Sequence, residues 1–111
     1  MAETIRMRAN VIYNIHQIAD EIQRNLLSDF ICREPVCNGY AVMLCYEKYF
    51  VRVSSFASLT VLISQEMSST DVVIVGSGGG AGVLNMSWGT NKSYAAEVQK
   101  LLLNYGFEVL G

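Results

Sequence analysis

The sequence is poor in charge and has no long apolar run, and each shortage excludes a class of protein. Only 16% of its 111 residues are charged, whereas soluble domains average about 25%. The formal net charge of −2 gives no attraction for phosphate, which argues against nucleic acid and anionic membranes as partners. No apolar run reaches the roughly 18 residues of a membrane span, and residues 1–8 lack a signal-peptide core. We expect a cytoplasmic protein with neither partner.

Three cysteines and one histidine provide little material for disulfides or a metal site. Cys32, Cys37 and Cys45 are odd in number and irregularly spaced, which favours reduced thiols. A zinc site needs four ligands and usually closely spaced pairs, but these cysteines are loosely spaced and His16 is the single histidine. No third group stands out that would orient His16 beside a thiol for catalysis. We therefore expect no metal, no cofactor and no enzyme activity.

What the chain has in quantity is apolar residues, which make up 51% of it. This proportion excludes a disordered chain. A length of 111 residues is enough for one domain with its own core and too short for two. We expect residues 1–111 to form a single α+β domain.

The first half of the chain predicts a strand, a helix and a connection. Residues 3–9 alternate between apolar and polar, as in a half-buried strand. Asn10 is a suitable N-cap for a helix reaching about Ser28. Apolar residues recur at helical spacing along it, at Val11, Ile15, Ile18, Ile22 and Leu26. Residues 33–39 contain Pro35 and the turn residues Cys37-Asn38-Gly39, and are predicted to be a connection.

The second half predicts four strands and a last helix. β-Branched and aromatic residues indicate the strands, over 40–53, 56–67, 71–75 and 83–88. Thr90 or Asn91 can cap the helix, and Gly106 is placed to terminate it. The predicted order is β-α-β4-α, an antiparallel sheet with two helices packed on one face.

A glycine-rich segment follows the strand predicted over 71–75. Gly76, Gly78 and Ala81 fit the G-x-G-x-x-G/A pattern that lets the backbone approach a pyrophosphate. A helix should begin directly after such a turn, whereas residues 83–88 predict a strand, and the lysine of a P-loop is missing. A hairpin loop is one interpretation, and nucleotide binding is the alternative. The ligand-binding residues would be Gly76, Ser77, Gly78, Gly79 and Gly80.

Aromatic residues suggest another alternative. Tyr13, Trp88, Tyr94 and Tyr105 either belong to an ordinary core or line a pocket between the helices and the sheet. Such a pocket would make the protein a carrier of a small apolar or aromatic ligand.

Three motifs together resemble a known family. They are Tyr46-Glu47-Lys48-Tyr49, Ser58-Leu59-Thr60-Val61 and the Ser77-Gly78-Gly79 turn, followed by a capped final helix. The chain resembles a family of short bacterial proteins known as a domain of unknown function. The β-α-β4-α order is also similar to the TATA-binding-protein-like fold, which includes nucleic-acid binders and carriers of hydrophobic ligands. The resemblance implies a fold and transfers no functional residues.

The apolar content predicts that something covers the sheet. Domains of this size bury only about 60–68% of the surface of the unfolded chain. Residues 40–45 and 71–75 carry apolar side chains on both faces, and two helices cover only one. We expect a second copy of the chain to cover the other, as a homodimer joined through the outer sheet face or an edge strand. The leading hypothesis is a non-catalytic homo-oligomeric assembly or binding module.

Overall fold

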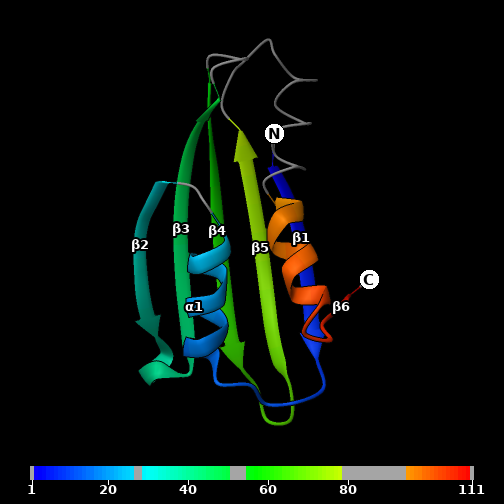
Figure 1. Cartoon of the computed structure of the whole chain (residues 1–111). Coiled ribbons are helices and arrows are strands. Elements are labelled where there is room, and N and C mark those ends of the chain that lie inside the picture. Colours follow the sequence, from blue (N-terminus) through cyan, green and yellow to red (C-terminus); the bar gives the residue numbers. More distant parts are fainter. Residues whose placement is uncertain (1, 27–28, 51–54, 79–94, 111) are drawn as a thin grey trace.

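A computed structural model describes residues 2–26, 29–50, 55–78 and 95–110 of the chain. In this part of the protein, six strands form one antiparallel sheet and two α-helices lie beside it (Figure 1). The α+β class and the antiparallel sheet predicted from the sequence are confirmed.

The chain builds the sheet mainly from neighbouring hairpins. Its elements are β1 (Ala2–Ala9), α1 (Ile15–Asn25), β2 (Asp29–Val36), β3 (Ala41–Phe50), β4 (Ser55–Gln65) and β5 (Thr70–Gly78). A helix then occupies residues 95–103, and β6 (Glu108–Val109) follows it. The strand order is β2-β3-β4-β5-β1-β6. β1 pairs with β5, so the first strand lies beside the last long strand that the structure describes.

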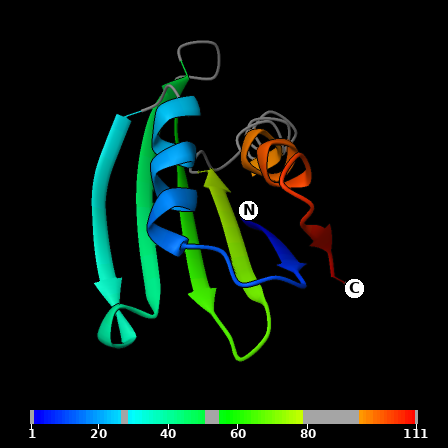
Figure 2. The same ribbon diagram turned by 60° about the horizontal axis from the view of Figure 1, so that its bottom comes forward.

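Both helices lie on the same side of the sheet in the two views (Figures 1 and 2). α1 lies over β3 and β4, and the helix 95–103 lies over the side of the sheet that contains β1. Their apolar faces and the inward side chains of the strands form one core. Its members include Met7, Ile15, Ile18, Ile22, Leu44, Leu59, Val61, Ile74, Val98, Leu102 and Phe107.

The periodicities read from the sequence agree with the burial pattern. Residues two apart in a strand share a face, and Leu59, Val61 and Ile63 of β4 are all fully buried. In α1 the residues at helical spacing, Ile15, Ile18 and Ile22, are also buried, as is Leu26 directly after the helix. The predicted strand over residues 3–9 and the inward face of α1 are therefore confirmed.

The start of α1 differs from the prediction. Asn14, not Asn10, caps the helix, since its Oδ1 accepts a hydrogen bond from the His16 amide (3.0 Å). Val11 precedes the helix and is half exposed. The Thr70 hydroxyl accepts from the Tyr13 amide and donates to the Val11 carbonyl, both at 2.9 Å. These bonds hold the chain against the start of β5. The helix begins at Ile15, four residues after the first position that a cap at Asn10 would give.

The segment predicted as a connection is a strand. Residues 29–36 form β2, which includes Pro35 in register with Val42 of β3. Proline is tolerated here because β2 is an edge strand, where one side of the backbone has no neighbour to receive a hydrogen bond. The predicted turn Cys37-Asn38-Gly39 does connect β2 to β3, and Gly39 has the positive φ (87°) that suits glycine.

The predictions for the last third of the chain are tested only in part. The strand predicted over 83–88 and the caps Thr90 and Asn91 lie outside the described residues. Gly106 does terminate the helix, with a φ of 89° that a side chain would oppose. The Phe107 amide folds back to the Leu102 carbonyl (3.2 Å), and the Phe107 ring is buried in the core.

Candidate functional site

The face of the sheet opposite the helices, called the outer face from here on, carries a central apolar cluster. The cluster consists of Met43 and Cys45 of β3, Leu62 of β4, and Val73 and Val75 of β5. These side chains alternate with fully buried inward residues such as Leu44, Val61 and Ile74, so they point to the opposite side. Leu62 is 37% exposed and the other four are half-buried. An apolar cluster with polar surroundings is the usual form of an interaction surface.

The strand register arranges this cluster in rows. Met43 is in register with Leu62, and Leu62 with Val73. At the two ends of this row lie Glu34 of β2, in register with Met43, and Arg6 of β1, in register with Val73. The row therefore has an acidic end, an apolar middle and a basic end.

A second row runs beside the first. It contains Cys32, Cys45, Thr60, Val75 and Thr4 in register across five strands. The two rows together give the outer face a middle of apolar and hydroxyl side chains.

An ion pair on the outer face lies beyond these rows. Arg8 Nε and Nη2 donate to the two carboxylate oxygens of Asp71, at 3.0 and 2.8 Å, and Ser69 Oγ donates to Asp71 at 2.9 Å. The hydrogen bond from Arg8 lowers the pKa of Asp71, and the hydrogen bond to Asp71 raises the pKa of Arg8. Arg8 is thus neutralised within the chain.

We expect Asp71→Asn to lower the free energy of unfolding by at most about 1 kcal/mol near neutral pH, because the pair is partly exposed. The folded-state pKa of Asp71 is depressed, so its contribution is present above the ordinary pKa of 3.8 and is lost as the pH falls through the folded value. Urea unfolding of both proteins over a range of pH measures this. With the exposed Glu97→Gln as control, a difference that persists unchanged in strong acid would contradict the assignment.

Two of the three cysteines are neighbours on the outer face. Cys32 and Cys45 are in register on β2 and β3, and burial, followed by a hydrogen bond with Cys32, raises the pKa of the Cys45 thiol. Cys37 is exposed in the turn. All three are free thiols. Among the described residues, no three His, Cys, Asp or Glu side chains gather in a way that could bind a metal ion.

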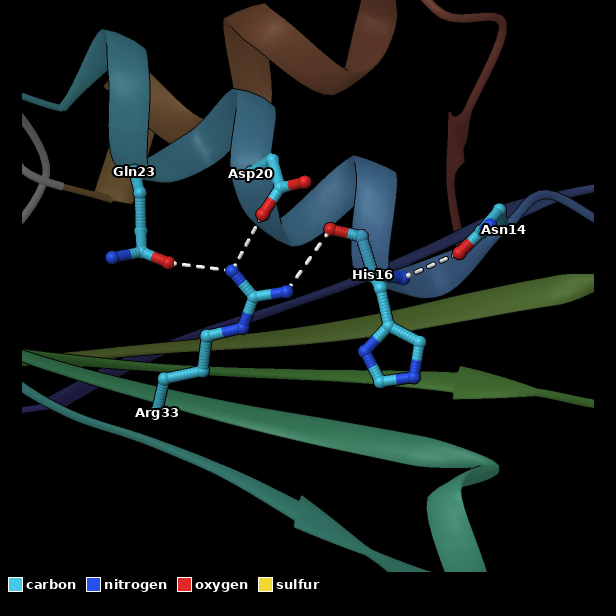
Figure 3. Close-up of polar contacts among 5 residues, drawn as sticks. All are labelled: Asn14, His16, Asp20, Gln23 and Arg33. Atoms are coloured by element: carbon cyan, nitrogen blue, oxygen red, sulfur yellow. Dashed lines mark hydrogen bonds and ion pairs between the residues drawn. The ribbon is translucent and has the colours of Figure 1, made fainter.

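The helix side of the molecule is held together by polar contacts (Figure 3). Arg33 of β2 donates to the side chains of Asp20 and Gln23, both at 2.7 Å, and to the carbonyl of His16 at 3.1 Å. Since β2 lies at one edge of the sheet, the Arg33 guanidinium links that edge to α1. His16 contributes its backbone carbonyl to this cluster.

A surface groove of about 440 Å³ lies beside α1. It is lined by Tyr13, Asn14, Gln17, Ile18, Asp20, Glu21, Arg24 and Tyr105. The Tyr13 hydroxyl donates to the Tyr105 carbonyl, and the Tyr13 ring stacks on Phe107 with centroids 5.6 Å apart. Burial, and next a hydrogen bond with Glu21, raise the pKa of Tyr105. Tyr13 and Tyr105 both line this groove, whereas Trp88 and Tyr94 lie outside the described residues, so an aromatic ligand pocket stays a prediction.

The glycine-rich segment is described only at its beginning. Gly76, Ser77 and Gly78 belong to β5, so the strand extends past the point where the hairpin connection was predicted to begin. Gly76 is in register with Glu3 on one side and Leu59 on the other. Gly79 and Gly80 lie outside the described residues.

The rows of the outer face were not singled out from the sequence. Apolar residues of both parities in 40–45 and 71–75 indicated a second buried face, but Leu62, Glu34 and Arg6 carried no signal of their own. Only the register of β1 and β2 with the central strands places the two charges at opposite ends of one row.

No helix in the part of the chain that the structure describes is long and apolar enough to cross a membrane.

Comparison with known proteins gives one finding. The model of a family of unknown function (DUF6054) matches residues 5–106. No curated protein and no solved structure matches the chain. The resemblance to a domain of unknown function, which rested on three short motifs, is therefore confirmed. Since the match spans nearly the whole chain, the protein belongs to this family.

Proposed function

We propose that this protein is a non-catalytic binding module of the cytosol that assembles as a homodimer through its outer face. The observation that carries the proposal is the central apolar cluster on that face. In the described part of the chain both helices lie on the other side of the sheet (Figure 2), so Met43, Leu62, Val73 and Val75 are left for a partner. Covering such a cluster removes apolar surface from water, which drives association.

The edges of the sheet are less suitable for assembly than its face. β2, at one edge, contains Pro35 and a register shift between Phe30 and Cys32. Both features interrupt the regular row of backbone groups that another strand would need. At the other edge, β6 has only two residues. We therefore place the interface on the face of the sheet.

The outer face approaches the size of a standard interface. Five strands about 4.8 Å apart and about seven residues at 3.3 Å each span roughly 24 by 23 Å. The flat area is therefore about 550 Å², which compares with the ~800 Å² per partner of a standard interface.

The order of the helices and strands allows a more specific description of the fold as part of this proposal. The order β1-α1-β2-β3-β4-β5 followed by a helix favours a β-α-β4-α domain with both helices on one face, similar to the TATA-binding-protein-like fold. β2 is a strand that the sequence did not predict, and the strand predicted over residues 83–88 lies outside the described residues.

The oligomeric state of the unmodified protein tests the proposal. We expect sedimentation or light scattering to give a dimer mass that dissociates with a Kd in the micromolar range or below. A monomer mass at all concentrations up to about 100 μM would overturn the proposal, because a surface of standard size should associate there.

The groove beside α1 supports a second candidate, the carrier of a small aromatic ligand. Its volume of about 440 Å³ lies in the range of ligand sites, but polar residues such as Asn14, Gln17 and Glu21 contribute much of its lining. A small-molecule adduct in native mass spectrometry would favour it over assembly alone. Nucleotide binding at Gly76–Gly80 stays a prediction.

A further inference from the structure

We propose that the two copies pair face to face about a two-fold axis that runs along β4, so that Glu34 of each copy meets Arg6 of its partner. This inference rests on the proposed function and specifies the geometry of the dimer. A closed dimer of identical chains presents the same surface twice, so each row that takes part in the contact must complement itself.

The first row is self-complementary about β4. A two-fold axis along β4, between the two faces, leaves β4 opposite itself and exchanges β3 with β5 and β2 with β1. Leu62 then meets its own counterpart, and Met43 meets Val73. Glu34 meets Arg6, and symmetry makes this contact twice.

The second row contains no charged side chain and is also self-complementary about β4. Thr60 meets its counterpart and Cys45 meets Val75, while Cys32 lies opposite Thr4. Apolar side chains therefore face apolar side chains in both rows, as the middle of an interface requires.

The charges distinguish this axis from one that runs across the strands. An axis running along the first row, across the strands, would leave every residue of that row opposite itself. Glu34 would then meet Glu34, and Arg6 would meet Arg6. Like charges placed opposite each other in an interface are strongly unfavourable, so the row favours the axis along β4.

Glu34 and Arg6 are available for such contacts. Both are exposed, and neither forms an ion pair with any other residue that the structure describes. The neighbouring Arg8, by contrast, is already engaged by Asp71. The pairing across the dimer would provide Glu34 and Arg6 with ion-pair partners, which neither has among the described residues.

Charge reversal tests the pairing. Glu34→Arg and Arg6→Glu, made separately, should each raise the dimer Kd about tenfold or more, because each places two like-charged contacts in the dimer. The double variant restores opposite charges and should return the Kd to within about threefold of the unmodified protein. Glu97→Arg and Lys100→Glu are the matched controls, since they make the same charge changes on the helix 95–103 and should leave the Kd unchanged.

Cross-linking locates the axis independently. In a background with Cys32, Cys37 and Cys45 replaced by serine, a short bismaleimide should join two copies through Leu62→Cys and not through Val73→Cys. Equal cross-linking at position 73 would indicate an axis across the strands and overturn the inference, as would a double charge variant no tighter than the single ones. Either result would overturn only the geometry of the dimer. A monomeric unmodified protein would overturn the proposed function as well.

Discussion

Replacing Leu62 by aspartate is expected to abolish the dimer at micromolar concentrations, with a Kd raised by at least about 100-fold. Leu62 lies in the middle of the central apolar cluster, between Met43 and Val73. In the dimer it would lie on the two-fold axis, so the variant brings two carboxylates together where water is excluded. The Kd from sedimentation at neutral pH measures the effect.

The matched control for this variant is Met67→Asp. Met67 is 97% exposed in the turn between β4 and β5, so the same negative charge is added close in sequence but away from the outer face. We expect this variant to keep the Kd of the unmodified protein. Far-UV circular dichroism establishes that the Leu62→Asp monomer is folded. A folded Leu62→Asp protein that still forms the dimer with unchanged Kd would show that the outer face is not the interface.

Replacing Thr70 by valine is expected to cost about 2 kcal/mol of unfolding free energy, which lowers the Tm by roughly 8 °C in a domain of this size. Thr70 is fully buried. Its hydroxyl satisfies the Tyr13 amide and the Val11 carbonyl, both at 2.9 Å. Valine has nearly the same shape, so the variant removes both hydrogen bonds while it keeps the packing.

Thr70→Ser separates the hydrogen bonds from the packing. Serine keeps the hydroxyl and loses a methyl group, which costs about 1 kcal/mol. Urea unfolding should therefore rank the unmodified protein above Thr70→Ser, and Thr70→Ser above Thr70→Val. Equal stability of the two variants would mean that water replaces the lost partners of Tyr13 and Val11, and that the contact does not fix the start of α1.

The sequence predicted the structure best where the periodicity of one helix or strand is enough to identify its buried residues. Ile15, Ile18 and Ile22 recur at the spacing of a helix, and all three are buried in α1. The alternation in β4 identifies its inward face in the same way. These patterns depend on the period of the backbone within one element, so no knowledge of distant residues is needed.

The sequence was misleading where contacts with distant residues decide the secondary structure. Asn10 is as good an N-cap as Asn14, but the hydrogen bonds of Thr70 engage the backbone of Val11 and Tyr13 before the helix begins. Pro35 indicated a connection, but it is accommodated in β2 because that strand lies at the edge of the sheet. Edge position is a property of the whole sheet, so residues 29–36 could not reveal it.

The sequence by itself determined the class of the fold, the inward faces of α1 and β4, and the excess of apolar residues in residues 40–45 and 71–75. These follow from local periodicity and composition. Only the tertiary structure decided that Glu34 and Arg6 end one row across five strands. The physical reason is that strand order and register depend on pairing between residues far apart in the chain, and alternation within one strand carries no information about its neighbours.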